Sequence, residues 1–175
     1  MRLSTKILAW KNCPLFTAEM LEIYIDADAC PVKEEAMHVA ERHGSKVFLV
    51  SNSWLRLTVA PMVEKIVVSE GADAADDWIA EHIAENDMVI TADIPLASRC
   101  LKRGAHALGP TGKEFTTANI GAALAMRELN AHLRETGASA GYNPSFTKRD
   151  KSQFLRSMED IIQRIKRDNQ RSTRP

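Results

Sequence analysis

The chain has 175 residues, enough for one domain with a hydrophobic core and short for two, and its 45% hydrophobic and 26% charged residues are typical of a globular protein. The 23 basic and 23 acidic side chains cancel, so net charge indicates no particular partner. The three cysteines lack CxxC spacing, which argues against a disulfide framework or a zinc site, and no apolar run is long enough to span a membrane.

Residues 1–19 differ in composition from the rest of the chain. They carry three basic side chains and no acidic one before Glu19, and their apolar stretch is too short for a secretory signal. We interpret them as an unstructured leader or a mis-assigned start, because Met20 opens the first clear strand; a transit-like leader is the alternative. We predict one domain at residues 20–167 and a disordered tail at 168–175.

Strand and helix patterns alternate along the remaining sequence. In chain order we predict a strand at 22–27, a helix at 31–44, strands at 46–51 and 65–69, a helix at 73–86, a strand at 87–92, a helix at 94–104, a strand at 105–109 and helices at 116–135 and 151–168. This alternation predicts an α/β fold with a mostly parallel central sheet of about five strands, flanked by helices and closed by a C-terminal helix. In such sheets, ligands bind beyond the carboxyl ends of the strands, where the strand order reverses.

Acidic residues follow three of the predicted strands at this edge of the sheet. Asp26 and Asp28 end the first strand, Asp76 or Asp77 opens the helix after the third, and Asp93 follows the fourth. Packed together, these carboxylates would repel one another without a cation. Oxygen ligands of this kind suit Mg²⁺ or Mn²⁺, so the sequence predicts a metal site. Taken singly, each acid can also be explained as a helix cap or as a partner of a helix dipole.

Charge is unevenly distributed along the chain. Residues 20–147 hold 11 Lys/Arg against 18 Asp/Glu, whereas residues 148–175 hold 9 against 4. An acidic body suits a metal cation, and a basic C-terminal segment can contact phosphates. A solvated helix face is the simpler explanation of that segment.

Two further patterns have structural explanations. The segment "GPTGKEF" at 109–115 lacks the Ser or Thr and the glycine spacing of a Walker A loop, although its backbone N–H groups could face an anion. Cys30, next to the first acids, has no histidine near it in sequence, so a small buried hydrophobe is a better interpretation than a catalytic thiol.

Several motifs taken together resemble the bacterial YaiI/YqxD family over residues 20 to about 165. They are "DADACP", "GADAADDWI", "TADIPLA", "GPTGKEFT" followed by "ANI", and "TKRDKSQF". The family is grouped with PIN-like domains, which are metal-dependent nucleases, so the resemblance implies their small α/β fold and their metal-dependent activity. The PIN acids then fall on Asp26, on Asp76 or Asp77, and on Asp93. The chain departs from the PIN pattern in Asp28 and Asp73, and only Glu114 is a weak equivalent of the last PIN acid.

The leading hypothesis is a metal-dependent nuclease of the cytoplasm that hydrolyses the phosphodiester bonds of RNA or DNA, with RNA the expected partner. We assign catalysis to Asp26, Asp76, Asp77 and Asp93, and binding of Mg²⁺ or Mn²⁺ to Asp26, Asp28, Asp77 and Asp93. We expect substrate contacts from Asn52, Thr91, Lys148, Arg149 and Lys151. No membrane partner is expected, and a homodimer is one assembly open to the chain.

Two alternatives remain at this stage. "IDAD" at 25–28 could belong to a phosphatase of the haloacid-dehalogenase type, with Asp26 as nucleophile and Asp28 as acid/base, although Cys30 and the lack of a later "GDxxxD" speak against it. A PIN-like fold can also serve as a metal- or RNA-binding module without turnover.

Overall fold

The structure of the protein is a computed structural model, and it describes residues 20–28, 30–56, 59–69, 71, 73–137 and 145–172. These residues form, in chain order, β1 (Glu22–Asp26), α1 (Lys33–His43), β2 (Lys46–Ser51), β3 (Val63–Val67), α2 (Ala74–His82), β4 (Met88–Ile90), α3 (Ile94–Lys102), β5 (His106–Leu108), β6 (Glu114–Phe115), α4 (Ile120–Glu135) and α5 (Lys148–Ser172). The predicted leader at 1–19 lies outside the described residues.

The strands form one mixed sheet in the order β3-β2-β1-β4-β5-β6. β1 to β5 are parallel, and β6 pairs antiparallel to β5 at the edge. The predicted α/β class, parallel sheet and C-terminal helix are therefore confirmed, with one additional short strand. The chain proceeds from β1 to one side and later returns to β4 on the other side, so the strand order reverses between β1 and β4.

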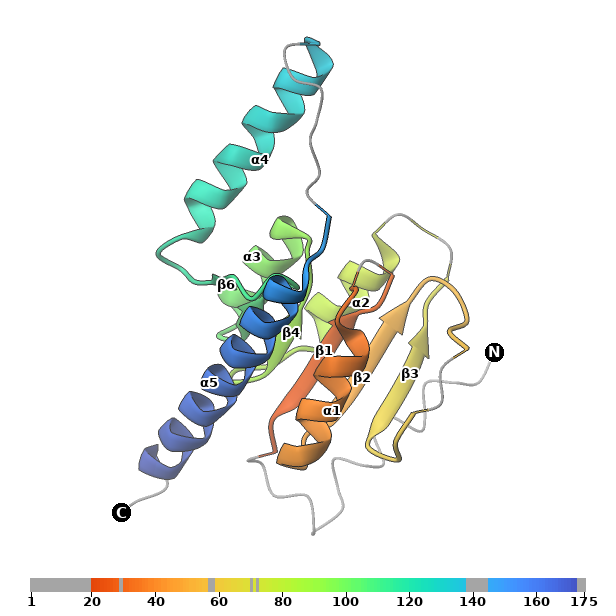
Figure 1. The fold of residues 1–175 in the computed structure, drawn as a ribbon, viewed down its shortest axis with the longest axis vertical. Helices are drawn as coiled ribbons and strands as arrows, with labels where there is room; N and C mark the ends of the chain where they lie inside the picture. Colours follow the sequence, from red (N-terminus) through yellow and green to blue (C-terminus); the bar gives the residue numbers. More distant parts are fainter. Residues whose placement is uncertain are drawn as a thin grey trace.

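Two pairs of helices cover the sheet, with α1 and α5 on one face and α2 and α3 on the other (Figure 1). In β1, Ile23 and Ile25 pack with α1 and α5, whereas Tyr24 packs on the opposite face. Both faces of the central strands are thus buried, which is why they appear in the sequence as continuous apolar runs.

The ends of several elements differ from the prediction. β3 begins at Val63, two residues before the predicted strand. α2 ends at His82, four residues before the predicted end, because the fully buried Ile83 adopts an extended conformation. α5 begins at Lys148 because Thr147 and Asp150 exchange hydrogen bonds as a capping pair, and it runs to Ser172, past the predicted domain boundary at 167.

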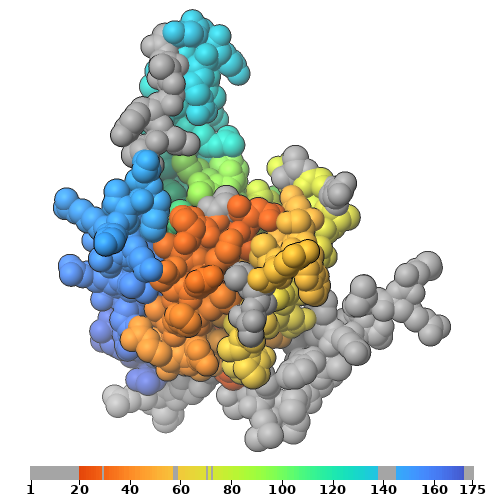
Figure 2. Space-filling view, turned by 45° about the vertical axis from the view of Figure 1, so that its right-hand side comes forward, coloured from red at the N-terminus to blue at the C-terminus, as the bar shows by residue number. Residues whose placement is uncertain are grey.

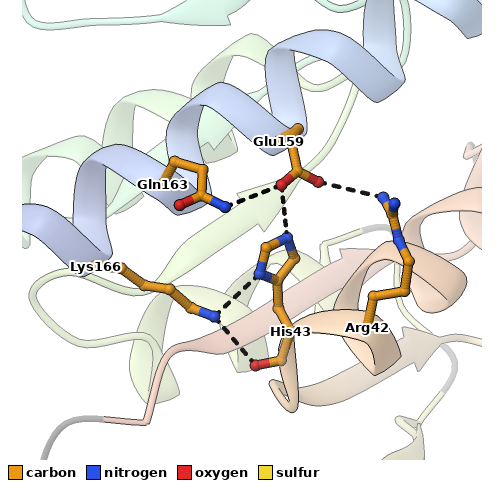
Figure 3. A network of polar contacts seen from close by, with 5 residues as sticks. All are labelled: Arg42, His43, Glu159, Gln163 and Lys166. Atoms are coloured by element: carbon orange, nitrogen blue, oxygen red, sulfur yellow. Dashed lines mark hydrogen bonds and ion pairs between the residues drawn. The ribbon is translucent and has the colours of Figure 1, made fainter.

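α5 runs in the same direction as α1, and its side chains contact both the first turn and the last turn of α1. Lys151 pairs with Glu35 in the first turn of α1. At the other end, His43 Nε2 donates to Glu159 Oε1 (2.9 Å), and Lys166 Nζ donates to His43 Nδ1 (3.0 Å) and to the His43 carbonyl (3.2 Å), as Figure 3 shows. Because α1 begins where β1 ends, this packing brings the first turn of α5 to the carboxyl edge of the sheet.

Candidate functional site

One hydroxyl joins the ends of the two strands at the point of strand-order reversal. The Thr91 hydroxyl donates to Asp26 Oδ2 (3.0 Å) and accepts from the Asp93 backbone N–H (3.0 Å). Thr91 is fully buried, and Asp26 is only 8% exposed. Thr91 therefore orients Asp26 and Asp93, a different role from the substrate contact expected from the sequence.

Asp93 both caps a helix and faces the carboxylate cluster, which consists of Asp26, Asp28, Asp76 and Asp93. Its Oδ2 accepts from the Leu96 backbone N–H (2.9 Å) at the start of α3, so the helix-cap interpretation holds for this oxygen. Its Oδ1 lies 3.8 Å from Arg127 Nη2 on α4. One carboxylate oxygen is thus occupied by the helix cap, and the other faces the half-exposed guanidinium of Arg127.

Asp28 and Asn52 continue the edge of the site toward β2. Asp28 is exposed, and its Oδ2 accepts from the Asn52 backbone N–H (2.7 Å). The Asn52 side-chain amide donates to the Gly71 carbonyl (3.3 Å), but its Oδ1 is buried and has no hydrogen-bond partner among the described residues. Buried oxygens rarely remain unpaired, so this atom is a candidate acceptor for a water, a substrate donor or an ion.

The two adjacent acids at the start of α2 differ in environment. Asp77 is exposed and pairs with Arg99 (2.7 Å). Asp76 is partly buried; burial raises its pKa to about 6, and the charges of Asp93, Asp26 and Asp73 contribute in the same direction. Asp76 is therefore the member of the pair that interacts with the carboxylate cluster.

The cluster carries an electrostatic cost in this arrangement. Burial raises the pKa of Asp26, and the carboxylates of Asp28 and Asp93 raise it further, against the effect of the Thr91 hydrogen bond. As the side chains lie, no three His, Cys, Asp or Glu residues in the described part of the chain stand close enough together to hold an ion. The donors are of the kind that a hard divalent cation prefers, but binding would require carboxylate side chains to move.

The predicted basic contacts lie at the first turn of α5. Lys148 and Arg149 are exposed there, whereas Lys151 is engaged by Glu35. Glu114, the weak equivalent of the last PIN acid, pairs with Arg164 on α5 and does not join the cluster.

Other sequence candidates have structural roles. Cys30 is buried in the apolar core beside α1, which confirms the interpretation as a small buried hydrophobe, and this burial raises the pKa of its thiol to about 11. The 109–115 segment consists of the tight turn after β5, at residues 109–113, and of β6 itself. The N–H groups of Gly109 and Gly112 donate to backbone carbonyls within it, to Lys113 and Gly109 respectively, so neither is available to an anion.

Arg127 is a residue near the site that sequence reasoning missed. It lies 34 positions after Asp93 and belongs to none of the acidic motifs. Its position depends on the direction in which α4 leaves the sheet, which no local pattern indicates.

The comparisons with known proteins agree with the motifs. A family model described as "Uncharacterized BCR, YaiI/YqxD family" matches residues 24–164. The chain belongs to this family. A UPF0178 protein of Agrobacterium fabrum is 59% identical over 146 residues, covering 83% of this chain and 95% of the relative. A UPF0178 protein of Parvibaculum lavamentivorans is 60% identical over 148 residues, covering 85% and 97%.

The names of these YaiI/YqxD relatives state no activity. No solved structure matches the chain, so the PIN-like likeness stays a prediction. None of the helices in the described ranges is both long enough and apolar enough to cross a membrane.

The contrast between Asp76 and Asp77 leads to a prediction about stability and pH. The pKa of Asp76 rises on folding from its ordinary 3.8 to about 6, so the folded state favours its protonated form. This contribution to stability is present below pH 3.8 and is lost as pH rises through about 6. Without metal at pH 7, Asp76→Asn should therefore melt above the wild type.

The matched control is Asp77→Asn, which removes a neighbouring charge and an exposed ion pair. It should melt at or slightly below the wild type at every pH. The measurement is the melting temperature of all three proteins between pH 4 and pH 8 in EDTA. A higher melting temperature in Asp77→Asn and an unchanged one in Asp76→Asn would show that Asp77, and not Asp76, interacts with the carboxylate cluster.

Proposed function

We propose that this protein is a metal-dependent phosphodiesterase that acts on nucleic acid, with RNA as the preferred substrate. The observation that carries the proposal is the gathering of Asp26, Asp76 and Asp93 where the strand order reverses, at positions where burial, and in addition the charges of neighbouring carboxylates, raise the pKa of Asp26 and of Asp76. A fold tolerates such repulsion when a ligand relieves it, and perturbed carboxylates at a ligand-binding edge are typical of functional sites.

The donor set fits Mg²⁺ or Mn²⁺ in chemistry. Carboxylates of Asp26, Asp28, Asp76 and Asp93 and the unpaired Oδ1 of Asn52 are hard oxygen donors of the kind these ions take. When bound, such an ion stabilises charge on a phosphoryl group and makes water more acidic. The Asp77 carboxylate, which we expected among the ligands, would have to leave Arg99 to take part.

The protein's own groups have distinct tasks in this proposal. Thr91 fixes the Asp26 carboxylate so that Oδ2 keeps one direction. The Asn52 backbone N–H does the same for Asp28. Lys148 and Arg149 stand at the start of α5, where the helix dipole adds to their attraction for the phosphates of a bound strand.

Two alternatives lead to different results. A non-catalytic binding module is favoured by the spacing of the acids, which is not that of a ready-made ion site. A haloacid-dehalogenase-type phosphatase would need Asp26 to attack phosphorus, but only 8% of this residue is exposed and one oxygen already accepts from Thr91. A trapped aspartyl-phosphate would identify the phosphatase.

The test is cleavage of end-labelled single-stranded RNA and DNA by the purified protein with Mn²⁺ or Mg²⁺. We expect hydrolysis that EDTA abolishes and that is faster on RNA. Binding of Mn²⁺ and RNA with no cleavage of any strand would contradict the nuclease proposal and favour the binding module.

A further inference from the structure

We propose that Arg127 binds a phosphate of the substrate strand, so that α4 completes the substrate site above the carboxylates. The inference rests on the proposed function and adds to it a contact from a helix that none of the site motifs reach. It identifies the ligand as a phosphodiester, which presents two non-bridging oxygens to a guanidinium fork.

The direction of α4 is fixed at its first turn. The Thr116 backbone N–H donates to Asn119 Oδ1 (3.0 Å), and the Asn119 backbone N–H donates to Thr116 Oγ1 (3.3 Å). The Asn119 amide also donates to the Glu114 carbonyl in β6 (3.0 Å). One of these three hydrogen bonds thus reaches the edge strand, and the other two join Thr116 and Asn119 to each other, so the chain between β6 and α4 is held in one conformation.

Only one face of α4 contacts the rest of the described structure. Ile120 and Ala123 pack against the core beneath α2 and α3, and Arg127 follows one turn later on the same face. No residue of this helix is buried, and α4 stands clear of the body in Figures 1 and 2 (cyan). The packing of Ile120 and Ala123 therefore places Arg127 beside Oδ1 of Asp93, and the rest of α4 extends away from the sheet.

The contact with Asp93 leaves most of the guanidinium free to bind a ligand. The Nη2–Oδ1 distance of 3.8 Å is too long for a hydrogen bond, and the Arg127 side chain is 52% exposed. An exposed pair of this kind contributes little to stability. Arg99, by contrast, makes a short contact of 2.7 Å with Asp77. Arg127 is thus a cation held beside the site with its N–H donors available.

Both partners of this loose pair have a stronger partner in the proposed reaction. Asp93 would exchange Arg127 for a divalent ion, and Arg127 would exchange Asp93 for a phosphate oxygen. The exchange keeps each charge paired, so the substrate phosphate can approach an acidic edge that would otherwise repel it.

The experiment compares Arg127→Gln, Arg127→Lys and Arg134→Gln with the wild type. Arg134 is the matched control because it lies on the same helix, about 10 Å further from the Asp93 end. Binding to a labelled single-stranded RNA with unmodified phosphates is measured by fluorescence anisotropy over a range of salt, with Ca²⁺ in place of Mn²⁺ and a gel to check that the strand stays intact. Cleavage of ordinary RNA gives KM and kcat.

We expect Arg127→Gln to bind about tenfold more weakly and to lose roughly 0.7 from the slope of log K against log salt, the share of one single-strand phosphate. Arg127→Lys should keep the slope and recover part of the affinity, because it retains the charge without the fork. Arg134→Gln should match the wild type. The metal concentration that half-saturates the Mn²⁺ melting shift should not rise in Arg127→Gln, since a competitor for Asp93 has been removed.

The outcomes distinguish a failure of the Arg127 inference from a failure of the proposed nuclease function. If the wild type cleaves RNA and Arg127→Gln matches it in affinity, salt slope and KM, the inference alone is wrong. If the wild type binds no RNA, both are wrong. If it binds without cleaving and Arg127→Gln binds more weakly with a reduced salt slope, the phosphate contact stands and the nuclease does not.

Discussion

Asp26→Asn is expected to slow Mn²⁺-dependent cleavage of RNA by at least about 100-fold, more than is typical for changes to residues that only support a metal ligand. The substitution keeps the size of the side chain and an oxygen that can accept from the Thr91 hydroxyl. It removes a negative charge that burial and the neighbouring carboxylates of Asp28 and Asp93 make unfavourable at this position. Without metal, the variant should therefore be at least as stable as the wild type.

Asp87→Asn is the matched control for this experiment. Asp87 is also a buried carboxylate, but it precedes β4 at the opposite edge of the sheet, where it accepts from the backbone N–H groups of Glu22 (3.2 Å) and Ala84 (2.9 Å). An amide cannot accept on both sides, so Asp87→Asn should lose stability and keep its cleavage rate at temperatures where it is folded. If Asp26→Asn cleaves RNA at the wild-type rate, the proposed nuclease loses its chemical basis.

Gly112→Ala is expected to cost roughly 2–5 kcal/mol of unfolding free energy, the sum of a left-handed backbone penalty and overpacking. Gly112 has φ +84° in the turn before β6, and a Cβ there would stand 2.6 Å from the Gln153 carbonyl carbon and 2.7 Å from the Phe154 nitrogen. The Ser157 hydroxyl donates to the Gly112 carbonyl (2.8 Å), so turn and helix cannot easily separate.

Gly44→Ala isolates the backbone penalty from the overpacking. Gly44 ends α1 with φ +65°, and a Cβ there would meet nothing within 4 Å. We expect a loss of about 1 kcal/mol in urea unfolding, well below that of Gly112→Ala. Equal losses in the two variants would show that the turn does not pack against α5 as described.

The sequence predicted the elements of the sheet well for a physical reason. The central strands β1, β2, β4 and β5 are buried on both faces and so appear as apolar runs, and each helix between strands has its own start and stop signals. β6 was missed because two residues are too few to show a periodic pattern. The early start of α5 had a signal in Thr147 and Asp150, which form the capping pair seen in the structure.

The candidate site was predicted in part, and the limits were also physical. Asp26 ends β1 and Asp93 follows β4, so their proximity follows from the parallel pairing of these two strands. The choice between Asp76 and Asp77 depends on the rotation of α2 about its axis, which the packing of Ala75 and Ile79 fixes. Arg127 required the direction of α4, which is fixed by hydrogen bonds of Thr116 and Asn119.

The most direct test of the central claim is a Mn²⁺ titration of thermal stability, with the wild type, Asp26→Asn and Asp76→Asn in parallel. Binding to the folded state alone stabilises it, by about 2.7 kcal/mol when the ion is at 100 times its Kd. The account predicts a saturable rise in the melting temperature of the wild type and the loss of most of that rise in both variants, which should start at or above the wild type without metal. No rise in the wild type, or an equal rise in all three proteins, would contradict a metal site built by these carboxylates.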